Sequence, residues 1–405
     1  MKSYFLVCYG GGHAKMILPV VKSLQADEQT DVIVLALTTA ASFFQNAGIK
    51  CLTMNSVTEF GAKSWRKLGE ELVSTESLSS LISYDDSVAY HGVNFAELVA
   101  TYGEEKAYSL YATSGRQAFF PFNFFCDLLS KVRPDLVIAT NSPRSERACI
   151  EAARHLSIPS VCLVDMFALH EVKWIAKNGF ADKVCVLNEH VKSFFESRGR
   201  AAKDVVVTGN PAFDTVNSAQ VRNRALELIN SNINYRDKFV ILYASQPEPL
   251  LHPFSGIEGN PELPRDIETL LRNYVAQKNN IHLIIRYHPS EKVTFYDSDN
   301  VSFSPNNEAL HPLLHVADIV VVTASTVGLE AHLASKHVVS VDCSIFTEDA
   351  PFSKMGISDG VPCPDSISAY LDDFFLRYKR HDLTTSLVSD SVATSKVIDV
   401  IKSME

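Results

Sequence analysis

Three glycines and a histidine follow the first apolar run of the chain. Glycines are suited to bind a ligand through the backbone, and a histidine can deprotonate it. The run from Tyr4 to Gly10 predicts a strand, and Gly10-Gly11-Gly12-His13 leads from it into a helical pattern. Consecutive glycines let a backbone approach a ligand closely, and the start of a helix favours negative charge. We therefore predict that Gly11 and Gly12 bind the ligand and that His13 is a general base. The alternative is a histidine that only caps a glycine turn.

A second candidate segment, Arg286-Tyr287-His288-Pro289, ends a predicted strand in the second half of the chain. Pro289 stops the strand, so His288 would project from its carboxyl end. Arginine and histidine at such a place suit a phosphate oxygen, because charge-assisted hydrogen bonds to anions are strong. We predict that Arg286 and His288 bind phosphate and that His288 also takes part in catalysis. The alternative is a histidine that is satisfied within a turn.

A third segment, Thr323 to Glu330, contains a strand end, a turn of small residues and a helix start. Ser325, Thr326 and the free amides of the first helical turn would cradle a phosphate, with Gly328 in the same turn. Glu330, one turn further on, could accept hydrogen bonds from both hydroxyls of a ribose. The same residues also fit an ordinary helix cap, since serine or threonine often precedes a helix.

Length and composition indicate a globular protein of more than one domain. The chain has 405 residues, of which 46% are hydrophobic and 21% are charged, and about 150 residues per domain is typical. No apolar run has the length of about 18 residues that a membrane-spanning helix needs. The net charge of −10 argues against nucleic-acid binding, which depends on clustered basic residues. The eight cysteines form no CxxC pair, so neither a zinc site nor a disulfide framework is predicted.

Two series of β-rich runs alternate with helical patterns, as in parallel sheets that are covered by helices. We predict one domain over residues 1–211, with an insertion at 55–120, and a second over 212–405, whose final helix packs back on the first domain. Gly209-Asn210-Pro211 is interpreted as the hinge. The insertion either lines a ligand site or is a surface excursion. The predicted strands are 4–10, 31–38, 135–140, 160–165, 184–188 and 204–209, then 239–245, 282–288, 318–325 and 337–342.

In this order, the glycine–histidine turn, the hinge segment, Arg286 to Pro289 and Thr323 to Glu330 resemble the GT-B superfamily, which contains nucleotide-sugar glycosyltransferases and UDP-N-acetylglucosamine 2-epimerases. The resemblance implies an α/β fold of GT-B type, with two Rossmann-like domains facing across a cleft. It implies that His13 deprotonates the acceptor, as in several transferases. It also implies a nucleotide-sugar co-substrate, UDP- or CMP/CDP-linked, with no tightly bound cofactor and no metal. The glycine spacing is not GxGxxG, which argues against NAD.

The chain departs from the epimerase pattern at two places. Where epimerases carry a Glu-rich, Arg-bearing stretch, this chain has Asp165 followed by Met-Phe-Ala-Leu-His-Glu. Their usual Asp-Ser-Gly-Gly turn is replaced by Ala324-Ser325-Thr326-Val327. We predict that Asp165 is a catalytic carboxylate, the alternative base to His13. These departures favour a metal-independent glycosyltransferase over an epimerase.

The leading prediction is a cytoplasmic transferase of surface-polysaccharide synthesis that moves a sugar to a glycan or lipid-linked acceptor. Peripheral contact with the inner face of the membrane is an open alternative. The rival functions are an epimerase or hydrolase that acts on the nucleotide sugar itself, and a non-catalytic nucleotide-sugar-binding protein. The aromatic run from Phe119 to Phe125 is interpreted as core or as the wall of a lipid-linked acceptor site, with a partner surface as the alternative.

Overall fold

The computed structural model describes residues 1–74, 81–253, 255–378 and 392–404. It divides into two units, one made of Met1–Asp214 with Ser391–Glu405 and the other of Thr215–Asp390. The division falls inside a short 3₁₀ helix, η4 (Pro211–Asn217), as does the predicted boundary between residues 211 and 212.

The first unit contains a six-stranded sheet in the order β2-β1-β3-β4-β5-β6, and every pair in it is parallel. Its strands are short runs rich in apolar residues, and the inner strands are buried on both faces, as is typical of parallel sheets. All five residues of β3 are buried, for example. The strands are β1 (Lys2–Cys8), β2 (Thr30–Ala36), β3 (Leu136–Thr140), β4 (Ser160–Leu163), β5 (Lys183–Val186) and β6 (Val205–Val207).

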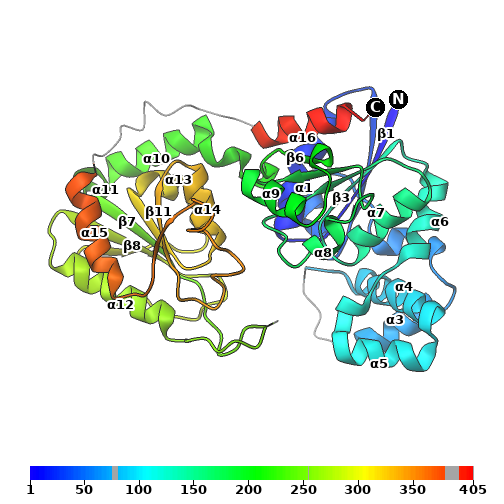
Figure 1. The fold of residues 1–405 in the computed structure, drawn as a ribbon, viewed down its shortest axis with the longest axis horizontal. Coiled ribbons are helices and arrows are strands. Elements are labelled where there is room, and N and C mark those ends of the chain that lie inside the picture. Colours follow the sequence, from blue (N-terminus) through cyan, green and yellow to red (C-terminus); the bar gives the residue numbers. More distant parts are fainter. Residues whose placement is uncertain (75–80, 254, 379–391, 405) are drawn as a thin grey trace. The chain divides into compact units, whose positions relative to one another are not determined.

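Helices alternate with these strands and supply the rest of the first unit (Figure 1). The C-terminal helix α16 packs against α1, and Val397 and Ile401 of α16 are fully buried in the same core as α1 and β1. The helices outside the insertion are α1 (Gly12–Gln25), α2 (Ala40–Asn46), α6 (Phe122–Val132), α7 (Ser145–His155), α8 (Val172–Ile175), α9 (Glu189–Ser197) and α16 (Val392–Lys402).

The predicted insertion is helical and forms a group of its own beside the first sheet (Figure 1). It contains η1 (Met54–Phe60), α3 (Trp65–Val73), α4 (Tyr84–Tyr102), α5 (Glu104–Ser114) and η2 (Gly115–Ala118). Helices α3 and α4 cross closely at Gly69 and Gly92, since a Cβ on Gly69 would lie 2.1 Å from the Val88 carbonyl oxygen. Phe119, Phe124 and Phe125 are buried, so the interpretation of the aromatic run as core is confirmed for these three.

The second unit contains another six-stranded parallel sheet, in the order β12-β11-β10-β7-β8-β9. Its strands are β7 (Phe239–Ala244), β8 (Ile281–Arg286), β9 (Val301–Phe303), β10 (Ile319–Val322), β11 (His337–Val341) and β12 (Asp359–Val361). Its helices are α10 (Ala219–Ser231), α11 (Ile233–Asp237), α12 (Leu263–Ala276), α13 (Leu310–Val316), α14 (Thr326–Leu333) and α15 (Ser366–Arg377).

The predicted α/β class, with two Rossmann-like units, is confirmed. Each of the ten predicted strands is present, although most end one to three residues earlier than predicted. The sequence interpretation missed the two short edge strands β9 and β12. Within the described ranges, no helix is long and apolar enough to cross a bilayer.

Candidate functional site

The first sheet has a switch point at β1, which lies between β2 and β3. The connections that leave β1 and β3 therefore run to opposite sides, and ligands of open α/β sheets bind at the carboxyl ends of strands where this happens. Gly10 to His13 follows β1, and Asn141 to Arg144 follows β3. The fold thus brings the predicted glycine–histidine turn next to polar residues that the sequence interpretation did not select.

The glycine turn after β1 has a backbone that needs glycine and leaves room for a ligand. Gly11 has φ 68° and ψ −136° and precedes α1, which has no side-chain cap. Few side chains tolerate that conformation, and the first amides of a helix seek acceptors. A Cβ on Gly12 would lie 3.0 Å from an oxygen of the Asp165 carboxylate. Two predicted site residues, Gly12 and Asp165, therefore meet in the structure.

Asp165 follows β4 and is fixed by two buried asparagines. Its backbone amide donates to Asn141 Oδ1 over 2.9 Å. Asn210 Nδ2 donates to the Asp165 carbonyl oxygen over 2.6 Å and to its carboxylate Oδ1 over 3.2 Å. Asn210 belongs to the segment interpreted as a hinge, so that segment also orients the predicted catalytic carboxylate. One carboxylate oxygen, Oδ2, lies on the side of Gly12.

His13 is held at the same edge of the sheet by the last residue of β3. Its Nδ1 lies 2.7 Å from Thr140 Oγ1, and Thr140 Oγ1 donates to Glu146 Oε1 over 3.2 Å. The Tyr9 amide donates to the same Glu146 oxygen over 2.8 Å. Burial raises the pKa of Glu146, and the nearby His13 opposes that rise. His13 therefore has an oriented ring with one nitrogen engaged, which is the geometry of a general base.

The helical insertion reaches this site through Tyr90 of α4. The Tyr90 hydroxyl is hydrogen-bonded to the Tyr9 hydroxyl. The Arg144 guanidinium lies 4.4 Å above the ring of Tyr9, a cation–π arrangement. Burial raises the pKa of Tyr9 well above its ordinary value, with Arg144 opposing, so Tyr9 stays neutral. The two tyrosines and Arg144 add hydrogen-bonding and positive groups beside His13.

The second sheet has its switch point at β7, which lies between β8 and β10. Ser325 follows β10 and is the N-cap of α14, where its hydroxyl accepts from the Val327 amide. Thr326 is exposed at the first position of the helix, so it is accessible to a ligand. Gly328 faces the protein instead, because a Cβ there would lie 2.9 Å from Val322 Cγ2. Of the predicted set in this turn, Ser325 and Thr326 lie at the helix start and Gly328 serves packing.

Arg286 and Glu330 are already engaged by neighbouring groups of the protein. Arg286 Nη1 donates to Ser304 Oγ over 2.8 Å, and Nη2 donates to the Glu308 carbonyl oxygen over 3.0 Å. Glu330 Oε2 lies 2.9 Å from His311 Nε2. Burial lowers the pKa of Arg286, and Glu308 and Glu330 oppose this shift. Arg286 thus holds the turn after β9, and a ribose would share Glu330 with His311.

His288 is exposed just beyond β8 and is oriented by its neighbours. Its Nδ1 accepts from the Ser290 amide over 3.2 Å and lies 2.7 Å from Ser290 Oγ. Its own backbone amide donates to Glu291 Oε2 over 2.7 Å. Because an amide can only donate, Nδ1 of neutral His288 is the acceptor nitrogen and Nε2 carries the proton. The Nε2–H can then donate to a phosphate oxygen.

Glu291 was missed by the sequence interpretation, and it connects three elements around His288. Its Oε1 accepts from Ser245 Oγ at the end of β7 and from Arg265 Nη2 of α12, over 3.0 and 2.8 Å. Arg265 Nη2 also donates to Ser245 Oγ over 2.7 Å. No sequence signal marked this pairing, since residues 245, 265 and 291 are far apart in the chain. The network fixes the loop that carries His288.

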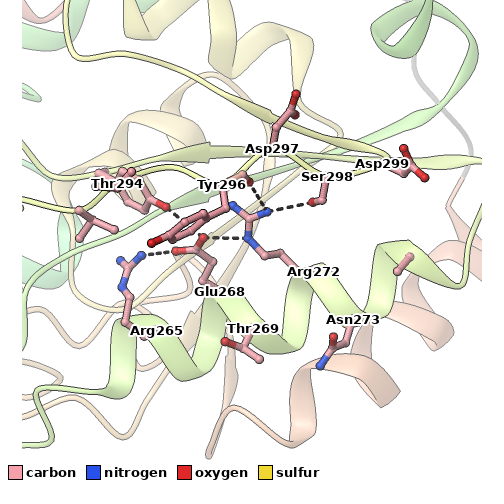
Figure 2. A pocket seen from close by; sticks show the side chains of 13 residues that line it. Arg265, Glu268, Thr269, Arg272, Asn273, Thr294, Tyr296, Asp297, Ser298 and Asp299 are labelled. Carbon is pink, nitrogen blue, oxygen red and sulfur yellow. Dashed lines mark hydrogen bonds and ion pairs between the residues drawn. The ribbon is translucent and has the colours of Figure 1, made fainter.

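A pocket of about 590 Å³ lies between α12 and the loop that follows His288 (Figure 2). Figure 2 shows Glu268 between Arg265 and Arg272 on α12. Arg272 Nε donates to Glu268 Oε1 over 2.8 Å, and Arg272 Nη1 donates to the Tyr296 carbonyl oxygen and to Ser298 Oγ, each over 2.9 Å. Arg272 is thus used to anchor residues 296–298 to α12. None of the predicted site residues lines this pocket.

The part of the chain that the structure describes contains no group of three or more His, Cys, Asp or Glu residues able to hold a metal ion. The first unit instead offers a histidine and a carboxylate beside a glycine turn. The second offers an exposed helix start and an Nε2–H donor. The groups of the first unit can perform acid–base chemistry, and those of the second can bind an anion.

No protein-family model matches the chain, and no curated protein matches it significantly. Solved structures resemble it over their full length. Staphylococcus aureus MnaA, solved with UDP, has a TM-score of 0.59 at 14% identity, and the match covers 99% of this chain and 96% of that one. The UDP-GlcNAc 2-epimerase of Methanocaldococcus jannaschii has a TM-score of 0.59 at 12% identity, with 100% of both chains covered. That of Neisseria meningitidis, bound to UDP-GlcNAc, has a TM-score of 0.56 at 12% identity, again with 100% of both chains covered.

At these identities the likeness concerns architecture. The similarity extends over the whole of both chains in two of these cases. The chain therefore has the two-unit α/β fold of GT-B type that is found in UDP-GlcNAc 2-epimerases.

Proposed function

We propose that this protein is an enzyme that acts on a UDP-linked sugar. The observation that carries the proposal concerns the carboxyl edge of the first sheet at its switch point. The Gly11–Gly12 turn lies there beside Asp165, and His13 is held there by Thr140. Oriented acid–base groups at such a place are typical of a catalytic site. The fold is that of proteins solved with UDP or UDP-GlcNAc, which supports a uridine nucleotide as the ligand.

The two units take different tasks in this proposal. In the second unit, the start of α14 with Ser325 and Thr326 binds the diphosphate, since helix N-termini favour anions. His288 donates its Nε2–H to a phosphate oxygen, and Glu330 binds the ribose alongside His311. In the first unit, the Gly11–Gly12 turn binds the sugar portion, and His13 and Asp165 move protons at the sugar. Arg286 contributes by holding the turn at residues 304–308.

We favour epimerisation or hydrolysis of the nucleotide sugar over transfer to an acceptor. The comparisons support this alternative better than the glycosyltransferase that the sequence led us to expect, because the similar structures include several UDP-GlcNAc 2-epimerases. Two observations keep transfer as the second candidate. Asp165 and the Ala324-Ser325-Thr326-Val327 turn depart from the epimerase pattern, and His13 is oriented as an acceptor base would be.

Incubation with UDP-GlcNAc in the absence of any acceptor distinguishes these functions. The reaction is followed by ¹H and ³¹P NMR, which separate a new UDP-sugar from free UDP and free sugar. An epimerase gives a new UDP-sugar, and a hydrolase gives free UDP and free sugar. In either case the rate should be well above that of the His13→Ala variant. Conversion only after a glycan or lipid-linked acceptor is added would replace this proposal by the transferase. Binding of UDP without conversion under either condition would indicate a non-catalytic binding protein.

Replacement of His288 by alanine is expected to lower turnover strongly with little change in melting temperature. The side chain is exposed and bonds only within its own turn, so its loss costs little packing. A donor to the leaving or bound phosphate is worth about 10²-fold or more in kcat. Steady-state kinetics and thermal unfolding measure the two effects. His332→Ala, on the exposed side of α14, is the matched control, and unchanged turnover of His288→Ala would reject this role.

A further inference from the structure

Glu146 is an acidic residue buried at the start of α7, where a solvated charge would be expected. Its side chain is fully buried, and burying a carboxylate is costly unless its oxygens are satisfied. Among the described residues it forms no salt bridge within 4 Å. Its oxygen Oε1 instead accepts from the Tyr9 amide and from the Thr140 hydroxyl, over 2.8 and 3.2 Å. This placement is unusual for a purely structural residue.

Thr140 connects Glu146 to His13, because its hydroxyl oxygen lies within hydrogen-bond distance of both side chains. The Tyr9 amide can only donate, so Glu146 Oε1 is an acceptor in this arrangement. The single hydroxyl proton of Thr140 is therefore donated to Glu146. The Thr140 oxygen then offers only lone pairs to His13 Nδ1, which lies 2.7 Å away. His13 must place its ring proton on Nδ1, and its Nε2 is left without one.

We infer that Glu146 is a positioning residue that acts through the Thr140 hydroxyl to hold His13 in the Nδ1–H tautomer, with Nε2 as the base. This inference rests on the proposed role of His13. When Nε2 takes a proton from the substrate or from water, the ring becomes an imidazolium and keeps its Nδ1 proton. No proton passes to Thr140 or Glu146. The carboxylate serves to orient the ring and to stabilise the positive charge that forms on it.

The surroundings of Glu146 allow it to orient His13 in either protonation state. Burial raises its pKa, while His13, the backbone amides of Tyr9 and Glu146, and the Arg144 guanidinium all oppose the rise. Its second oxygen, Oε2, is buried without a hydrogen-bond partner. A proton taken up there would leave Oε1 free to accept from Thr140. The tautomer of His13 is thus set by geometry and survives changes in the charge of Glu146.

The tautomer can be read directly by long-range ¹H–¹⁵N correlation NMR of the full chain labelled with ¹⁵N-histidine. His13 is one of 13 histidines and is assigned by its absence in a His13→Gln variant. In mildly alkaline buffer, we expect wild-type Nδ1 to resonate as a protonated nitrogen and Nε2 as an unprotonated one. Thr140→Val, which removes the hydroxyl at equal size, should move the proton toward Nε2. Thr140→Ser, which restores the hydroxyl, should keep the wild-type pattern.

Glu146→Met tests the distal end of the chain of contacts. Without the carboxylate, the Thr140 hydroxyl is free to donate to His13 Nδ1, so the ring should change to the Nε2–H form. On UDP-GlcNAc, Thr140→Val and Glu146→Met should lower kcat about a hundredfold with KM changed far less, because a misoriented base costs about 10². Thr140→Ser should recover most of the rate, which a loss of general stability would not predict.

The outcomes separate this inference from the proposed function. The NMR experiment needs no substrate, so the predicted tautomer and its changes support the inference even if no nucleotide sugar is converted. In that case only the proposed function is rejected. An Nε2–H tautomer in the wild-type protein overturns the inference alone. A tautomer that is the same in wild type, Thr140→Val and Glu146→Met also overturns it, whatever the rates of the variants.

Discussion

His13→Ala is expected to abolish most of the turnover of the nucleotide sugar while the protein stays folded and still binds UDP. A positioned general base contributes about 10²- to 10⁴-fold to a rate, so we expect kcat to fall within that range. The His13 side chain is partly exposed in the first turn of α1, and the core below it is made by other residues. Nucleotide binding belongs to the second unit in our proposal and should change little.

His190→Ala provides the matched control for this variant. His190 is an exposed histidine of α9 in the same unit, and its loss should leave kcat and melting temperature unchanged. Kinetics on UDP-GlcNAc and a UDP titration are measured for both variants. A His13→Ala protein with at least a tenth of the wild-type kcat would transfer the role of base to Asp165, which is fixed at the same edge by Asn141 and Asn210.

Ser325→Asp is expected to weaken UDP binding strongly without destabilising the protein. Aspartate is as good an N-cap as serine, and a negative charge at a helix start is favourable. Two negative charges about 4 Å apart repel by about 4 kcal/mol at an effective dielectric constant of about 20. The new carboxylate should therefore raise the Kd for UDP at least about tenfold, because our proposal places the diphosphate at the start of α14.

Ser325→Asn separates charge from capping at the same position. Asparagine also caps helices well but carries no charge, so this variant should retain UDP affinity within a few-fold. Isothermal titration and thermal unfolding of both variants give the comparison. Equal affinities of the Asp and Asn variants would mean that the diphosphate binds elsewhere, and the pairing of Ser325 with the nucleotide would be withdrawn.

The ten predicted strands could be recognised because each is a short run rich in apolar residues, as strands of a parallel sheet covered by helices are. The two missed strands lack that signal. Of the three residues of β9 and of β12, only Val301 and Val361 are buried. Both strands lie at the edges of the second sheet, where one neighbour is enough to hold them. Their pairing depends on tertiary contacts that no local pattern reveals.

The candidate site of the first unit was partly predictable for a similar reason. The glycine turn before His13 and the carboxylate after β4 follow strands directly, and parallel strands bring such positions to one edge. Glu146 was not predictable, because it stands within a charged helical pattern, RSERA, that is typical of a solvated surface. It becomes buried only because the start of α7 lies beside the Tyr9 amide. Asn210 was likewise interpreted as part of a hinge, although its side chain holds Asp165.

In the second unit, the residue types correctly indicated where the side chains lie but not what they bind. Ser325 and Thr326 stand at the helix start, as predicted. Gly328 is required by the contact with Val322 and Phe352, and Arg286 is taken up by the turn at residues 304–308. Arginine has five donors, and sequence alone does not indicate whether backbone carbonyls or a ligand will accept from them.

The central claim, that the protein binds a UDP-linked sugar, is tested most directly by thermal unfolding with UDP, UDP-GlcNAc, CMP, CDP, GDP and NAD. A ligand at about 100 times its dissociation constant adds about 2.7 kcal/mol to the stability of the folded state, which raises the melting temperature measurably. We predict selective stabilisation by UDP and UDP-GlcNAc, lost in Ser325→Asp. Stabilisation by NAD alone, or by none of these nucleotides, would contradict the claim.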